Sequence, residues 1–156
     1  MSPPVRFGSG GRVRAVLISG DPAMCEQLRL QLGFGDRVDI VDSVRACADG
    51  VPATRLYRPG VVVLSLRNRR GGCCRHLVRP LSLLAPVLVL IDRPDVPLVP
   101  KLLAAGARSF LVRGEYTVDE LVNATTATAR NIVHLSPAAA TVLVDLLHAR
   151  PVNVPF

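Results

Sequence analysis

The sequence contains no tryptophan, only 4% aromatic residues, and a single lysine, Lys101, among its 19 basic residues. Without aromatics interleaved among the arginines, it lacks the stacking platforms that single-stranded nucleic acid usually requires, although a net charge of +7 permits acidic partners. Apolar residues still make up 49% of the chain, so a core can form, and that core must be aliphatic. A length of 156 residues predicts one globular domain.

Long apolar runs and metal-ligand patterns are also missing. The longest apolar run, 81–91, is interrupted by Ser82 and Pro86 and falls well short of the roughly 20 residues of a membrane helix. The N-terminus has no apolar signal core. No C-x-x-C spacing or histidine pattern for zinc accompanies the four cysteines, which are Cys25, Cys47, Cys73 and Cys74. We therefore expect a cytoplasmic protein with no membrane contact, no metal and no cofactor.

Five short apolar runs are rich in the β-branched and long aliphatic side chains that suit buried strands. They cover residues 13–18, 38–41, 61–66, 86–91 and 108–112. Helical patterns alternate with them. Five strand–helix units in this order predict an α/β fold, a doubly wound parallel sheet with helices on both faces and right-handed crossovers.

Capping signals indicate where the helices begin. Asp21 precedes a proline and is a predicted N-cap, and Thr117 with Glu120 forms a capping box. Ser43 is a candidate cap for a helix that runs to about Thr54. Further helices are expected at 73–83 and 99–106. One face of the helix after Thr117 is predicted to consist of Leu121, Val122, Thr125, Ala129 and Ile132.

A sixth helix falls outside the repeating unit and begins at Ser136–Pro137. Apolar residues follow one side of it, at Ala139, Val142, Leu143, Leu146 and Leu147. Two interpretations stay open for this stripe. It either caps the domain or forms a dimer interface, in which case the interface residues are Val142, Leu143, Leu146 and Leu147.

Four segments carry a family resemblance: ISGDP at 18–22, SLRNRRG at 65–71, LLAAGARSFLVRGEYTVDELVNA at 102–124 and HLSPAAATVLVDLL at 134–147. Together with the strand–helix order they resemble the receiver domains of two-component response regulators, a flavodoxin-like fold of the CheY kind with five βα units. The similarity is greatest to the NarL/FixJ (LuxR-type) regulators. It implies a receiver-like domain at 13–133 and a C-terminal linker helix and tail at 134–156. The Pro, Gly and Ser residues of the N-terminus predict a flexible tail at 1–12.

The positions that the resemblance assigns to phosphorylation depart from the family pattern. Where the family has the acidic residues that hold Mg²⁺, this chain has Ser19 and Gly20, and Ser65 replaces the aspartate that accepts the phosphoryl group. Ile91 stands for the switch serine or threonine, and Arg113 stands for the lysine after the fifth strand. The resemblance therefore implies a degenerate phosphorylation pocket without catalytic residues, and no enzyme.

The first hypothesis is a phosphorylation-independent receiver, the regulatory and dimerising domain of a bacterial transcription regulator whose helix-turn-helix is absent from this chain. DNA would then be reached only through a separate C-terminal domain. Control would come from homodimerisation, a regulatory protein or a small-molecule ligand. Arginines that could hold an anionic ligand are Arg67, Arg69 and Arg70, although in an arginine-rich chain such residues are more often solvated loop residues.

Two other hypotheses for the function are a redox sensor and an enzyme. Cys73 and Cys74 lie among arginines, and neighbouring cations favour the reactive thiolate, which suggests a stand-alone redox sensor. The alternative is that Cys25 and Cys47 are small core residues and one of the adjacent pair faces inward. An enzyme has the least support, because no G-x-S-x-G elbow surrounds Ser65 and the histidines lie in or beside predicted helices.

Overall fold

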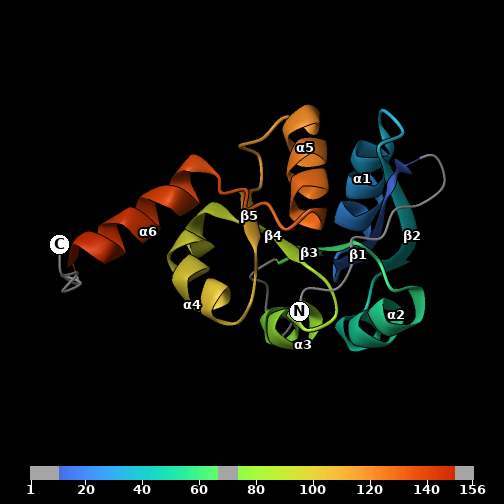
Figure 1. Cartoon of the computed structure of the whole chain (residues 1–156), viewed down its shortest axis with the longest axis horizontal. Coiled ribbons are helices and arrows are strands. Elements are labelled where there is room, and N and C mark those ends of the chain that lie inside the picture. The colour runs from blue at the N-terminus through green and yellow to red at the C-terminus, as the bar shows by residue number, and fades with distance from the viewer. Residues whose placement is uncertain (1–10, 67–73, 150–156) are drawn as a thin grey trace.

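A five-stranded parallel sheet forms the centre of the computed structural model, which describes residues 11–66 and 74–149 (Figure 1). The strands are β1 (Val13–Ser19), β2 (Val38–Val44), β3 (Val61–Ser65), β4 (Val87–Ile91) and β5 (Ser109–Val112). Their order across the sheet is β2-β1-β3-β4-β5. The predicted doubly wound α/β architecture with an extra C-terminal helix is confirmed.

Helices cover both faces of the sheet (Figure 1). On one face lie α1 (Pro22–Gly33) and α5 (Val118–Ala129), and on the other lie α2 (Gly50–Tyr57), α3 (Val78–Ser82) and α4 (Val99–Ala104). Short 3₁₀ turns precede the second group: η2 (Cys47–Asp49), η3 (Cys74–Leu77) and η4 (Arg93–Leu98). The last helix, α6 (Pro137–Ala149), extends outward from the β5 side of the molecule.

Alternating side chains of the central strands belong to two separate core layers, one on each face of the sheet. In β3, Val62 and Leu64 belong to the layer under α2, α3 and α4, whereas Val61 and Val63 belong to the layer under α1 and α5. All of β3 and β4 is buried, which explains why these two strands read as continuous apolar runs. The core is aliphatic, as the composition requires, with Phe110 as its largest fully buried side chain.

Two of the three predicted helix caps are present. The Asp21 carboxylate accepts hydrogen bonds from the backbone N–H groups of Ala23 (3.0 Å) and Met24 (3.4 Å). The Thr117 hydroxyl accepts one from the N–H of Glu120 (3.1 Å). Each side chain satisfies donors that the first helical turn would otherwise leave open.

Two details of the sequence interpretation are wrong. Ser43 does not cap a helix, because β2 continues to Val44 and pairs with β1 through a bulge between Ile40 and Asp42, so strand pairing overrides the local signal. Ile132 is not on the buried face of α5, since that helix ends at Ala129 and Ile132 is 56% exposed.

The segment that leads into α6 is attached to the edge of the sheet. The Phe110 N–H donates to the carbonyl of His134 (2.9 Å), and the Ser136 N–H donates to the carbonyl of Phe110 (3.0 Å). The Ser109 hydroxyl oxygen also accepts from the N–H of His134 (2.9 Å). Leu135 thereby forms a parallel bridge with Phe110, and α6 starts from a fixed position.

The first part of helix α6 packs on the domain, whereas its last part exposes apolar side chains. Its first part packs on the core, with Ala139 fully buried and Val142 and Leu143 in contact with the same cluster. Beyond them, Leu146 is 36% exposed and Leu147 is 59% exposed. The first part of α6 therefore caps the domain, with Val142 and Leu143 on the core, and a dimer interface at Leu146 and Leu147 stays a prediction.

Candidate functional site

The candidate site begins with two serines at the carboxyl ends of neighbouring central strands. Ser19 ends β1, Ser65 ends β3, and the two are partners in the strand register. Both are almost fully buried, at 1% and 4% exposure. The Ser19 hydroxyl lies 3.3 Å from the backbone N–H of Asp21, while Gly20 is exposed. Open α/β sheets bind ligands at this edge, so these serines mark the place to look for chemistry.

Arg113 occupies this place. It follows β5 directly, and its backbone N–H donates to the carbonyl of Ile91 (2.8 Å), which fixes the residue against the end of β4. Its guanidinium donates hydrogen bonds to the Ser65 hydroxyl, to the Leu66 carbonyl (3.2 Å) and to the Asp92 carboxylate (3.3 Å). Only 11% of the Arg113 side chain is exposed. One of the chain's own cations therefore contacts Ser65 at the carboxyl end of the sheet.

The Asp92 carboxylate balances the positive charge of the Arg113 guanidinium. Asp92 forms an ion pair with Arg113 and is itself about one third exposed, so the carboxylate remains in contact with solvent. The planar guanidinium can serve three acceptors at once, which a lysine ammonium in the same place would do less well. Across the described residues, no group of three histidine, cysteine or carboxylate side chains is arranged to hold a metal ion.

Ile91 and Tyr116 complete the surroundings. Ile91 is fully buried in the core layer under α3 and α4, so the position that the resemblance assigns to a switch hydroxyl is an apolar core position. Burial raises the pKa of the Tyr116 phenol, and the nearby charge of Arg113 opposes that shift. The phenol is accordingly neutral at physiological pH.

Asp92 and Tyr116 were not predicted as site residues. A usable signal existed for Asp92, because it is the first polar residue after the fourth apolar run and so lies at the carboxyl edge of the sheet. Tyr116 offered no such signal, since it lies three residues beyond Arg113 in a turn whose path only the tertiary structure defines.

The remaining candidate residues fall into two groups. Arg67, Arg69, Arg70 and Cys73 lie outside the residues that the structure describes. Cys74 is described, is 2% exposed, and forms a disulfide with Cys47, with a Cα–Cα distance of 5.7 Å. Cys47 is therefore more than the small core residue considered above, whereas Cys25 is a buried free thiol.

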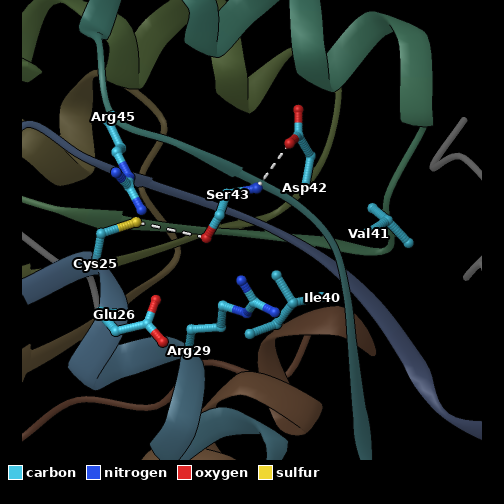
Figure 2. A pocket seen from close by; sticks show the side chains of 8 residues that line it. All are labelled: Cys25, Glu26, Arg29, Ile40, Val41, Asp42, Ser43 and Arg45. Carbon is cyan, nitrogen blue, oxygen red and sulfur yellow. Dashed lines mark hydrogen bonds between the residues drawn. The ribbon is translucent and has the colours of Figure 1, made fainter. Parts of the chain in front are cut away.

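A separate polar hollow of about 440 Å³ lies between α1 and β2 (Figure 2). Figure 2 shows the Ser43 side chain pointing toward Cys25, with 3.4 Å between the hydroxyl oxygen and the sulfur. Two arginines and two carboxylates line the hollow, so their formal charges cancel: Arg29, Arg45, Glu26 and Asp42. Such a lining gives no preference for a ligand of either charge.

The sheet order and the helices on both faces are those of the flavodoxin-like fold of the CheY kind, to which receivers belong. No protein-family model matches the chain, and no curated protein matches it by sequence. None of the helices in the described part of the chain has the length and hydropathy to cross a membrane.

Solved structures with this fold include NarL-type receivers, which confirms the resemblance indicated by the motifs. A two-component response regulator of the LuxR family from Aurantimonas sp. SI85-9A1 is 20% identical, with a TM-score of 0.76 over 86% of this chain and 97% of its own. The receiver domain of the putative response regulator NarL from Mycobacterium tuberculosis is 26% identical, with a TM-score of 0.63 over 76% and 97%. RcsB, solved as two dimers bound to two parallel DNAs, is 11% identical, with a TM-score of 0.70 over 85% and 68%.

Proposed function

We propose that this chain is a phosphorylation-independent receiver, the regulatory and dimerising domain of a bacterial transcription regulator in the cytoplasm. The single observation that carries the proposal is the contact of the Arg113 guanidinium with Ser65, at the position where a receiver would accept a phosphoryl group. Arg113 stands at the position of the family's lysine, and it contacts a serine hydroxyl where a working receiver has the acceptor carboxylate that helps to bind Mg²⁺. The domain regulates by binding and is not an enzyme.

The chemistry of phosphoryl transfer supports this proposal. Transfer from a phosphohistidine needs a carboxylate acceptor and carboxylate ligands for Mg²⁺, because the hard cation takes oxygen ligands and neutralises phosphoryl charge. Ser19 and Gly20 supply no charge, and a serine hydroxyl at 65 cannot form an acyl phosphate. Asp21 is held by the first turn of α1 as its cap. One carboxylate used in this way makes a poor magnesium site.

Thermal melting with Mg²⁺ and beryllofluoride, a mimic of the acyl phosphate, tests the proposal. We expect the melting temperature of the chain to change by less than about 1 °C, since a ligand stabilises a protein only when it binds the folded state. Ser65→Asp should behave in the same way, because the new carboxylate would pair with Arg113 and positions 19 and 20 would still not bind the metal.

A response-regulator receiver with its full set of acidic residues serves as the positive control under the same conditions. A rise of several degrees in the wild-type chain would contradict the proposal and would mean that a carboxylate completes a working pocket. A rise confined to Ser65→Asp would show that only the acceptor had been lost.

Control of such a domain passes to association, a regulatory protein or a small anionic ligand at the pocket. We propose that the chain forms homodimers and that the receiver-like part at 13–133 is followed by a linker helix and tail at 134–156. The exposed part of α6 supports the homodimer, because Leu146 and Leu147 present apolar surface away from the core. Contact with DNA would require a separate C-terminal domain.

Leu147→Arg tests the role of α6 in association. Leu147 is 59% exposed, so the charge enters no core and folding should be unchanged. In a dimer across α6 the two arginines would meet, and we expect the dissociation constant to rise at least about tenfold, since one buried leucine contributes roughly 1.5–3 kcal/mol. Analytical ultracentrifugation over a concentration series measures the change.

Leu56→Arg provides the matched control, because Leu56 is an equally apolar residue of α2 with 75% exposure. We expect this variant to associate like the wild type. Equal association of all three proteins would place the interface elsewhere, and a monomeric wild type at every concentration would refute the homodimer.

A further inference from the structure

Cys47 and Cys74 lie in short turns that follow different strands but reach the same side of the sheet. Cys47 begins η2, between β2 and α2, and Cys74 begins η3, which leads into α3. The chain separates them by 27 residues, yet their Cα atoms are 5.7 Å apart, within the range that a disulfide requires. The structure joins the two sulfurs.

Packing that involves no sulfur holds these turns together. A Cβ at Gly50, the residue after η2, would lie 2.9 Å from Cδ1 of Ile18 and 3.4 Å from Cδ1 of Leu77. Ile18 belongs to β1, so the start of α2 packs closely on β1 and lies at van der Waals distance from Leu77 of η3. Because Leu77 and Cys74 belong to the same core layer, reduction would leave the two thiols near one another, and the bond could form again.

The two sulfurs differ in their access to solvent. Cys74 is 2% exposed, whereas Cys47 is partly exposed at the start of its turn. An external thiolate therefore reaches Cys47 first, and Cys74 is the leaving group. In a cytoplasmic protein a disulfide is usually transient or redox-sensing, because the compartment keeps thiols reduced.

We infer that Cys47 and Cys74 form a reversible thiol–disulfide pair that makes this domain responsive to low-molecular-weight thiols and disulfides. This inference goes beyond the proposed function and does not rest on the loss of phosphorylation, because neither sulfur belongs to the pocket of Ser65 and Arg113. Its partner is a glutathione-type monothiol together with the corresponding disulfide.

The exchange balances in two steps. A thiolate of the small thiol attacks the Cys47 sulfur, the bond between the protein sulfurs breaks, and its electron pair leaves on Cys74, which takes a proton from water. A second small thiolate then attacks the mixed disulfide, releasing the small-molecule disulfide and the Cys47 thiolate. Two small thiols are oxidised to one disulfide while the protein disulfide is reduced to two thiols, and oxidation is the reverse.

The covalent ring closed by this bond contains α2 and β3, and so it includes Ser65 at the end of β3. Closing a ring of this size restricts the unfolded chain more than the folded one. For a domain of this length, oxidation should raise the melting temperature by roughly 10 °C. Redox state thus changes the stability of the part of the domain that carries the degenerate pocket.

The test equilibrates the purified 156-residue chain in glutathione buffers of graded reduced-to-oxidised ratio, followed by alkylation, peptide mapping and melting. We expect one reversible transition between a 47–74 disulfide and two free thiols, with the melting shift between its two ends. Cys47→Ser and Cys74→Ala should both lose the transition and the shift, and alanine spares the buried position 74 an unpaired hydroxyl. Cys73→Ser is the matched control and should behave like the wild type.

Three results would overturn the inference. Mapping could find Cys73 in place of Cys74 in the bond, with Cys73→Ser abolishing the transition. The thiols could stay free at every ratio. The disulfide could also survive the most reducing buffer in the folded chain, which would make it a permanent crosslink. Because Cys47 is partly exposed, Cys47→Ser keeps the test interpretable even where Cys74→Ala fails to fold.

Discussion

Arg113→Ala is expected to lower the free energy of unfolding by about 2 kcal/mol, between the values typical of exposed and of fully buried ion pairs. The substitution removes the donor for Ser65 and the Leu66 carbonyl, both on the buried side, and for Asp92, which solvent can partly rehydrate. For a domain of this length the loss corresponds to about 4–8 °C in the melting temperature. Arg113→Lys should recover about half, since it retains the charge but not the planar fork.

Arg93→Ala is the matched control for this experiment. Arg93 also pairs with a carboxylate, Glu115 at 3.3 Å, but 66% of its side chain is exposed. Removing an exposed pair of this kind should cost less than about 1 kcal/mol. Equal effects of the two substitutions, or no change in Arg113→Ala, would mean that the guanidinium does not stabilise the pocket and that its position there carries no argument about function.

Phe110→Ala is expected to have the largest effect on stability. Phe110 is fully buried and is the largest such side chain in the core, so its truncation leaves a cavity as well as losing apolar burial. Substitutions of this kind cost about 3–5 kcal/mol, which corresponds to about 10 °C or more here. Urea unfolding measures the difference, with an unchanged slope showing that the unfolded state is the same.

Phe34→Ala provides the comparison, because Phe34 follows α1 and is 70% exposed. We expect a change within about 0.5 kcal/mol. A similarly small effect at Phe110 would contradict the placement of β5 in the core layer shared with α4 and α6.

Much of the fold could be predicted from local signals. The β-branched runs identify buried strands without any knowledge of their neighbours, and the Asp21 and Thr117 caps depend on atoms within three residues. The end of β2 could not be predicted, since the bulge between Ile40 and Asp42 exists only in the pairing with β1. Local preference pointed to a cap at Ser43, and strand pairing prevailed.

The candidate site could also be predicted only in part from the sequence. Strand order places Ser19 and Ser65 at one edge, and Arg113 could be expected there because it directly follows the fifth strand. The ion pair with Asp92 depends on the direction of two side chains, which sequence spacing does not encode. The pairing of Cys47 with Cys74 depends on two turns that meet although β1 separates their strands.

The bridge between Leu135 and Phe110 has a consequence for how copies of this chain can meet. An open sheet edge offers unpaired N–H and C=O groups to any passing strand, and soluble proteins protect such edges. Here the N–H and C=O of Phe110 are taken by His134 and Ser136, and a proline follows at once. Strand addition beside Phe110 is thereby blocked, so contacts between copies on this side of the molecule have to be made by helices. The segment that protects the edge is also the one that starts α6.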